Sequence, residues 1–271
     1  MKDNHAFTLD ESGPISYLTI DTELPVWTAF STRSGGISNP PYATANMAYH
    51  VGDDPRSVRE NRRLLSLAVT GREGVPVYTT SQVHGGDFLL LDADSRLELR
   101  EEENQPADAL ITAVPGILLG IMIADCLPVL LIDRHLRAVA AAHAGWRGLL
   151  AGIVPRTMSA MEMHYGVKPA DLLVLLGPCI GRCCYQVGEE LIRKFMAEFS
   201  FAGDHGWYEE LSGNYYLDLR RLQVLQLRKM GVPLTMIKVA DQCTACGNFF
   251  FSYRREHAIT GRQIAVVGLE L

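Results

Sequence analysis

The sequence has little positive charge and contains no run of Lys and Arg that would form a basic face. It has 25 Lys and Arg against 31 Asp and Glu, which gives a formal net charge of -6. Proteins that bind nucleic acid usually present a basic face, so we expect no nucleic-acid partner.

A long apolar segment is also missing. The most apolar stretch runs from Ile117 to Ala124 before Asp125 interrupts it, which is too short to span a bilayer. The N-terminal residues Met1–His5 are polar and lack the apolar region of a signal peptide. These features predict a cytoplasmic protein without a membrane partner.

Several catalytic fingerprints are absent. The sequence contains no G-x-S-x-G, no P-loop and no G-x-G-x-x-G, which argues against the commonest hydrolase, nucleoside-triphosphate and dinucleotide classes. The H-x-E and P-C-x-x-C signature of the usual zinc deaminases is missing, so any deamination would need another architecture. None of the eight histidines forms a His-x-His pair, which argues against a multicopper cluster.

Cysteine is present six times, and in a cytoplasmic chain of this size that indicates metal binding or catalysis before disulfides. Cys243 and Cys246 have C-x-x-C spacing, but Cys179 and Cys183 are too far apart to form a second such pair. For these four and Cys184 we expect ordinary buried or surface thiols. A structural zinc site and a redox pair are the alternatives.

No linker, repeat or low-complexity segment divides the chain, and we expect a single domain over residues 1–271. Strands come both in consecutive groups and alternating with helices, which favours a mixed sheet flanked by helices in the α/β or α+β class. The charged segment 96–105 predicts a surface loop or a short exposed helix. Caps and helical spacing predict helices at 53–68, 148–165, 189–199 and 218–230. Apolar runs predict strands at 77–80, 88–91, 117–123, 128–132, 138–142, 172–176, 236–239 and 264–269.

Two candidate functional segments lie next to apolar strands. Ser81–Gly85 places His84 after a strand, where a histidine either faces a cleft or forms a surface hydrogen bond. Ala124–Pro128 breaks the apolar sequence with Asp125 and Cys126. Because a buried carboxylate is costly unless it is paired or liganded, this segment indicates a site, the alternative being a hairpin turn with a small core cysteine.

A third segment, His143–Gly148, joins a strand to a helix. Such a turn places backbone N–H groups and the positive end of the helix beside His143. Arg147 in the same turn suits phosphate or another anion, and Trp146 either stacks on a flat ring or packs in the core.

Together, His84, Cys126 and His143 offer two imidazoles and one thiolate. These ligands suit zinc, and three protein ligands leave a fourth position open, as catalysis requires. We therefore predict a zinc site, with copper as the alternative ion because both ligand types accept it.

The order of motifs resembles the laccase-domain family, also called the multicopper polyphenol oxidase or YfiH-like family. The matching segments run in order from Phe30 to Leu269 and cover nearly the whole chain. They are FSTRSGGIS, NMAYHVGDD, SQVHG, ADCLPVLL, AAHAGWRG, LGPCIGRCCYQVG, FFFSYRRE and TGRQIAVVGL.

The resemblance implies a four-layer α/β/β/α sandwich related to bacterial deamidating toxins and other cysteine hydrolases. It implies zinc at the positions of His84, Cys126 and His143. It also implies purine nucleoside phosphorylase activity on adenosine, inosine, guanosine and S-methyl-5'-thioadenosine, together with adenosine deaminase activity.

The same resemblance assigns Arg33 to activity, and its forked guanidinium suits phosphate or ribose oxygens. Asp125 is the candidate proton carrier for deamination. We expect the nucleoside and phosphate to bind through Arg33, Asn46, Gln82, Trp146 and Arg147.

Two other functions compete with this one. Cys126 and His143 would form a nucleophilic pair in an amide hydrolase, with Asp125 as the orienting acid and a role in peptidoglycan precursor editing. A copper-dependent polyphenol oxidase is the other alternative. The sequence contains no feature that indicates whether the protein is a monomer or an oligomer.

Overall fold

The computed structural model describes residues 7–92, 105–203 and 206–270. The charged segment expected at 96–105 lies outside the described residues except for Gln105.

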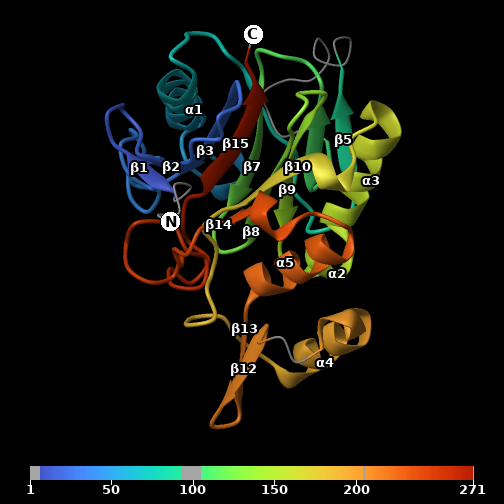
Figure 1. The fold of residues 1–271 in the computed structure, drawn as a ribbon. Helices are drawn as coiled ribbons and strands as arrows, with labels where there is room; N and C mark the ends of the chain where they lie inside the picture. Colours follow the sequence, from blue (N-terminus) through green and yellow to red (C-terminus); the bar gives the residue numbers. More distant parts are fainter. Residues whose placement is uncertain (1–6, 93–104, 204–205, 271) are drawn as a thin grey trace.

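Two six-stranded mixed sheets form the centre of the molecule (Figure 1). The first has the order β1-β2-β3-β15-β7-β4 and the second the order β14-β10-β8-β9-β6-β5. The strands of the first sheet are β1 (Thr8–Asp10), β2 (Tyr17–Thr19), β3 (Val26–Ser31), β15 (Gln263–Leu269), β7 (Leu118–Ile123) and β4 (Val77–Tyr78). Those of the second are β14 (Ile237–Val239), β10 (Leu172–Leu176), β8 (Leu127–Asp133), β9 (Val139–Ala144), β6 (Ala109–Thr112) and β5 (Phe88–Leu91).

The second sheet is apolar on both faces, because one face packs against the first sheet and the other against helices. Leu130 and Ile132 of β8 pack toward the first sheet, in a core that includes Phe30 of β3. Their neighbours Val129 and Leu131 pack on the opposite side, in a core shared with helices. This alternation follows from the two-residue period of a strand and explains the continuous apolar runs in the sequence.

Helices cover the two outer faces. The helix α1 (Pro55–Thr70) packs Leu65 against the first sheet. On the second sheet lie α2 (Trp146–Leu150), α3 (Ile153–Tyr165) and α5 (Leu219–Lys229). The order of layers is therefore helix, sheet, sheet, helix, as the family resemblance implies.

A smaller unit projects from this body in Figure 1. It is a three-stranded antiparallel sheet with the order β11-β13-β12, accompanied by α4. Its elements are β11 (Gln186–Val187), α4 (Glu189–Glu198), β12 (Tyr208–Leu211) and β13 (Asn214–Leu217). Among the helices of the described residues, none has the length and apolar character needed to cross a membrane.

The predicted helices and strands agree with the structure at most positions. The differences are one predicted helix that is divided in two and several strands that were not predicted. The helix expected at 148–165 is two helices, because Gly152 adopts a left-handed conformation (φ 73°) and separates α2 from α3. The predicted strands do not include β6 or the short strands β1, β2 and β11–β13. The six-residue β3 was missed because polar Thr28 and Ser31 interrupt its apolar sequence, although both are buried.

Candidate active site

The register of the second sheet brings three separate segments to one end of the sheet. In the antiparallel pair β8–β9, Pro128 lies opposite His143 and Leu127 opposite Ala144. Cys126 directly precedes β8, so it reaches the end of β9 next to His143. On the other side of β9, Ala109 pairs with Ala142, which places Asp108 beside His143.

Asp108 is a buried carboxylate that holds both histidines in place. It pairs with His143 Nδ1 at 2.8 Å and accepts hydrogen bonds from the backbone N–H groups of His84 (2.9 Å) and Gly85 (2.6 Å). Its own backbone oxygen accepts a hydrogen bond from the N–H of His143 at 2.7 Å. Because Nδ1 of His143 is committed to Asp108, its Nε2 is the nitrogen left to act as a ligand or a base.

The side chains of His84, Cys126 and His143 form a compact group. Their ligand atoms lie within 4.8 Å of one another, and the two imidazole rings are 4.8 Å apart at an angle of 81°. His143 is 3% exposed whereas His84 is exposed, so the group is anchored in the core and open on one side. That combination suits a ligand set with a free position facing a substrate.

The charges in this group favour a thiolate beside an imidazolium. Burial alone would raise the pKa of Cys126, but the charge and hydrogen bonds of His143 and His84 lower it to about 6. Burial alone would lower the pKa of His143, but the Cys126 thiolate and Asp108 raise it to about 9. Burial likewise opposes ionisation of Asp108, yet the hydrogen bonds from His143 and Gly85 keep its pKa below the usual value.

Gly145 leaves the room that this group needs. A Cβ at this position would lie 2.9 Å from Cys126 Sγ and 3.3 Å from Cδ2 of His84. Its φ of -66° is available to any residue, so the constraint is steric rather than conformational. Any larger side chain here would displace the thiol or the imidazole.

A cavity of about 430 Å³ opens over the three side chains. Three arginines lie in its wall, each with an aromatic ring beside its guanidinium carbon: Arg147 over Trp146 (4.3 Å), Arg254 over Tyr185 (5.4 Å) and Arg262 over Tyr253 (5.7 Å). The lining residues are His50, Gln82, His84, Met122, Ala124, Asp125, Cys126, His143, Trp146, Arg147, Ile180, Tyr185, Tyr253, Arg254 and Arg262.

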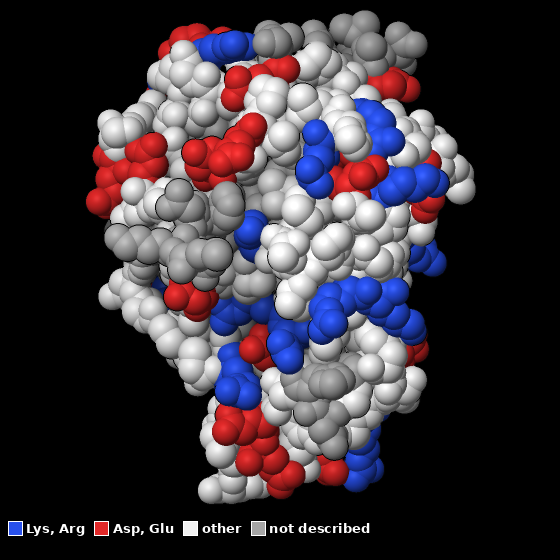
Figure 2. Space-filling view, in the orientation of Figure 1, with Lys and Arg blue, Asp and Glu red and all other residues white. Residues whose placement is uncertain are grey.

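Positive charge is therefore concentrated locally in a chain whose net charge is -6. Figure 2 shows Lys and Arg gathered where the body meets the β12–β13 ribbon, with Asp and Glu toward the outer part of that ribbon. Guanidinium groups around a concave site attract anions and fork onto carboxylate or phosphate oxygens.

Two further predicted residues, Gln82 and Asp125, line the cavity while bonding to its frame. The Gln82 amide bridges the backbone of Met122, donating to its oxygen at 2.8 Å and accepting from its N–H at 2.7 Å. The carboxylate of Asp125 accepts from Thr244 Oγ1 at 2.6 Å and from the backbone N–H of Arg254 at 2.7 Å. The acid that orients His143 is thus Asp108, and the expectation that Asp125 does so is wrong.

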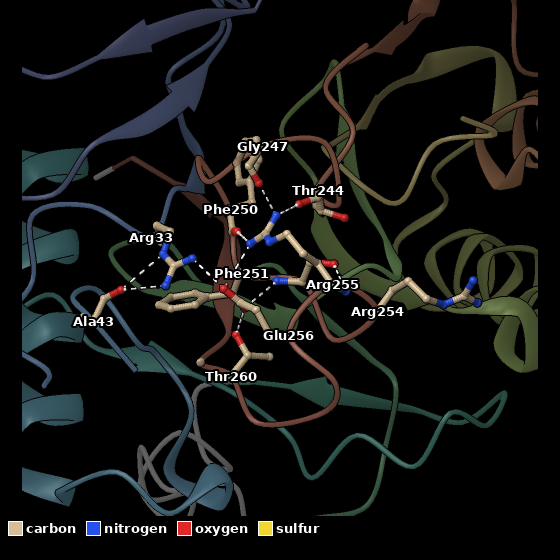
Figure 3. Close-up of polar contacts among 12 residues, drawn as sticks. Arg33, Ala43, Thr244, Gly247, Phe250, Phe251, Arg254, Arg255, Glu256 and Thr260 are labelled. Atoms are coloured by element: carbon tan, nitrogen blue, oxygen red, sulfur yellow. Dashed lines mark hydrogen bonds and ion pairs between the residues drawn. The ribbon is translucent and has the colours of Figure 1, made fainter. Parts of the chain in front are cut away.

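Arg33 is not among the cavity-lining residues. Its Nη1 donates to Glu256 at 2.6 Å, its Nε and Nη2 both reach the carbonyl oxygen of Ala43 at 3.2 Å, and its guanidinium carbon lies 4.8 Å from the centre of the Phe251 ring (Figure 3). All three guanidinium nitrogens therefore have protein partners outside the set of residues that line the cavity.

Asn46 also lies behind the wall and is fully buried. Its amide nitrogen donates to Ala48 and to Asp53, and its amide oxygen accepts from the backbone N–H of Arg262 at 2.9 Å. The structure thus brings together His84, Cys126, His143, Gln82, Asp125, Trp146 and Arg147, and sets Arg33 and Asn46 apart from them.

Sequence reasoning missed Asp108 and the cavity residues Tyr185, Arg254 and Arg262. A signal for Asp108 does exist, because an acid directly before the apolar strand Ala109–Thr112 must find partners if it is buried. The arginines carry no such signal, since their place in the wall depends on loops far apart in the chain.

Comparison with known proteins gives consistent matches over almost the full chain. Residues 27–270 match the family described as multi-copper polyphenol oxidoreductase laccase. Purine nucleoside phosphorylase YfiH of Escherichia coli K12 is 39% identical over 240 residues, which is 88% of this chain and 92% of that protein. Purine nucleoside phosphorylase PA4543 of Pseudomonas aeruginosa is 39% identical over 258 residues, 94% and 99% of the two chains.

Solved structures match equally well. The crystal structure of YlmD from Geobacillus stearothermophilus has a TM-score of 0.87 at 31% identity and covers 98% of this chain and 100% of its own. That of the Bacillus licheniformis protein YfiH has a TM-score of 0.86 at 30% identity, covering 97% and 99%.

The paired charges of Cys126 and His143 predict an unusual pH dependence of thiol reactivity. In chelator-treated protein, alkylation of Cys126 should become half-maximal near pH 6 rather than near 9, because the thiolate fraction rises as pH passes the lowered pKa. Peptide mass spectrometry after a short iodoacetamide pulse measures this for each cysteine. Cys179 is the internal control, since burial raises its pKa to about 12.

The variant His143→Ala removes the positive partner and should move the Cys126 midpoint upward. An unchanged midpoint in this variant would show that the imidazole does not stabilise the thiolate.

Proposed function

Because the chain belongs to the multi-copper polyphenol oxidoreductase laccase family, and its relatives of that family are named purine nucleoside phosphorylases, we propose that it is a zinc-dependent purine nucleoside phosphorylase. The proposed substrates are adenosine, inosine, guanosine and S-methyl-5'-thioadenosine, with adenosine deamination as a second activity. The observation that carries the proposal is the His84–Cys126–His143 group beneath a cavity with three arginines and three aromatic rings in its wall.

The donor set fits zinc. Two imidazoles and one thiolate are borderline-soft ligands, and Asp108 supplies the carboxylate partner that metal-bound histidines usually have. Gly145 keeps the space beside Cys126 Sγ open. When bound, zinc held by three protein ligands supplies a Lewis acid with one free position for water or substrate.

The cavity wall supplies the groups that a nucleoside and phosphate need. We assign phosphate to Arg147, Arg254 and Arg262, whose forked donors match its oxygens. The purine would stack on Trp146 or on the exposed ring of Tyr253, since flat rings favour offset stacking. These contacts would hold phosphate and the ribose carbon in line for displacement of the base, which is the main contribution that positioning makes to such a reaction.

In this proposal Arg33 and Asn46 act through the wall rather than on the substrate. Arg33 holds Glu256, which accepts from the backbone N–H of Ser252 at 3.2 Å and so stabilises the segment that carries Arg254. Asn46 holds the backbone of Arg262. The sequence-based expectation of direct contact with phosphate or ribose would require the Arg33–Glu256 ion pair to open.

For deamination, the proton carrier would be Asp125, which neighbours Cys126 in the cavity lining. Its hydrogen bonds with Thr244 and Arg254 fix the carboxylate in position. A carboxylate can accept about four hydrogen bonds, so Asp125 can accept these two and still contact a substrate.

One observation favours a second candidate, an amide hydrolase that uses Cys126 as nucleophile. The imidazole of His143 lies between the Cys126 thiol and the Asp108 carboxylate. Nucleophilic catalysis uses the same arrangement of nucleophile, base and orienting acid. The same three residues serve both candidates, and bound metal separates them, because a zinc-bound thiolate is not available for attack.

A polyphenol oxidase with several coppers is not favoured. Within the described part of the chain, the two groups of metal-binding side chains contain only two histidines between them, His84 and His143. Copper clusters of that kind need several imidazoles in close pairs.

The central prediction concerns phosphate-dependent release of adenine from adenosine. Wild-type protein should release adenine only when phosphate is present, and Cys126→Ala should lose both this activity and the zinc of this site, because a site with two ligands holds the ion weakly. Liquid chromatography of the products and elemental analysis measure the two effects together.

A matched control is His164→Ala, which removes an exposed histidine at the end of α3, compared with His84→Ala. Only the latter should lose activity. Folded wild-type protein that is purified without chelator, contains no zinc and releases no adenine even after zinc is added would contradict the phosphorylase proposal and favour the amide hydrolase.

The role assigned to Arg33 predicts non-additive effects. Arg33→Ala and Glu256→Gln should each lower kcat/KM for phosphorolysis by up to about 100-fold, because a misplaced Arg254 lowers productive positioning. The double variant should lose little more than either single variant, since both changes break one ion pair. Steady-state kinetics of the four proteins measures the coupling, and Arg33→Ala at the wild-type rate would exclude any role for this residue.

A further inference from the structure

Four cysteines outside the active site converge on one point. Cys183 and Cys184 follow β10, whereas Cys243 and Cys246 follow β14, about sixty residues further along the chain. Their four sulfur atoms all lie within 4.8 Å of one another. Cys246 Sγ is 3.4 Å from both Cys183 Sγ and Cys184 Sγ. The fifth cysteine of this region, Cys179, is buried and stands apart from the group.

The pairing of β10 with β14 brings the two loops together. These strands are parallel, with Leu176 opposite Val239, and the contact continues as a parallel bridge between Cys179 and Cys243. Parallel strands end at the same edge of a sheet, so the loops that follow them lie side by side. Spacing alone does not reveal this group. Cys243 and Cys246 form a C-x-x-C pair, but the two cysteines that join them, Cys183 and Cys184, are adjacent in sequence and match no common metal-binding motif.

The geometry suits a metal ion better than a disulfide. Four thiolates around zinc at about 2.3 Å have neighbouring sulfurs about 3.8 Å apart in a tetrahedron. Two of the sulfur separations are 3.4 Å and none exceeds 4.8 Å, so the group is compact enough to surround one ion. Cys246 Sγ is equally far from Cys183 Sγ and Cys184 Sγ, so the geometry singles out no disulfide partner for it.

One backbone N–H and two guanidinium groups lie close to the loop that carries Cys243 and Cys246. The N–H of Gly181 donates to Cys243 Sγ at 3.1 Å. Arg255 donates to the carbonyl oxygens of Thr244 and Gly247, which bracket Cys246, as Figure 3 shows. Arg220 donates to the carbonyl of Ala240 at 2.8 Å. Two guanidinium groups therefore lie against the loop that would carry the excess negative charge of a four-thiolate site.

We propose that Cys183, Cys184, Cys243 and Cys246 bind a second zinc ion, separate from the ion at His84, Cys126 and His143. All four positions of this site are filled by protein, which is the arrangement of a structural rather than a catalytic zinc.

The site would fix one wall of the cavity. Thr244, between the two cysteines of the second loop, donates to the carboxylate of Asp125 at 2.6 Å. Ile180, in the first loop, donates its N–H to the backbone oxygen of Asp125 at 2.9 Å. Asp125 directly precedes Cys126, so the second zinc would hold together the loops that position the active-site thiolate.

Zinc content tests the proposal on full-length protein purified without chelator under reducing conditions. Wild-type protein should contain about two zinc ions per chain, and both Cys183→Ser/Cys246→Ser and His84→Ala/Cys126→Ala should contain about one. Undiminished zinc in the Cys183→Ser/Cys246→Ser protein overturns the proposal. The test separates this proposal from the proposed function: if only the Cys183→Ser/Cys246→Ser protein contains less zinc than the wild type, the four-cysteine site is supported and the zinc assigned to His84, Cys126 and His143 is not.

X-ray absorption at the zinc edge covers the case in which the cysteine variant fails to fold. In the His84→Ala/Cys126→Ala protein, the remaining zinc should have a shell of sulfur only, at about 2.3 Å. Nitrogen or oxygen ligands in that shell, or iron in place of zinc, would contradict the assignment.

Discussion

Taking the carboxylate of Asp108 out of water costs on the order of several kcal/mol unless charge and hydrogen bonds compensate for it. In this protein the compensation comes from the imidazole of His143 and the backbone N–H groups of the His84 turn. One buried acid therefore sets the tautomer of one histidine and the position of the other. The candidate active site depends on that interaction, because it holds in place the two imidazoles that lie beside Cys126.

The wall of the cavity is built in two layers. Arginines paired with aromatic rings form the inner layer, and Arg33, Asn46 and Glu256 bind the backbone or the ion-pair partners behind it. Asp125 and the four-cysteine group extend the same support to the segment that carries Cys126. Such polar contacts behind the wall hold the side chains of a site that is built from loops far apart in the sequence.

The site residues that could be predicted from the sequence are polar residues that interrupt or end an apolar run. His84, Cys126 and His143 stand at the ends of apolar runs, where a polar side chain needs an explanation, and the structure brings them together. Asp108 escaped notice because it precedes a strand of only four residues. Arg33 and Asn46 lie in recognisable motifs, yet their place behind the wall depends on ion pairs and backbone contacts that spacing does not encode. The cysteine group depends on the β10–β14 register, which no local pattern specifies.

The most direct test of the metal site is an anomalous difference map at the zinc absorption edge, from crystals of protein purified without chelator. We predict a peak within bonding distance of Cys126 Sγ, His143 Nε2 and the ring of His84, with Nδ1 of His143 still paired with Asp108. A map without density at that position, from crystals in which the three side chains are ordered, would contradict a zinc site and leave Cys126 as a free thiolate beside an imidazolium.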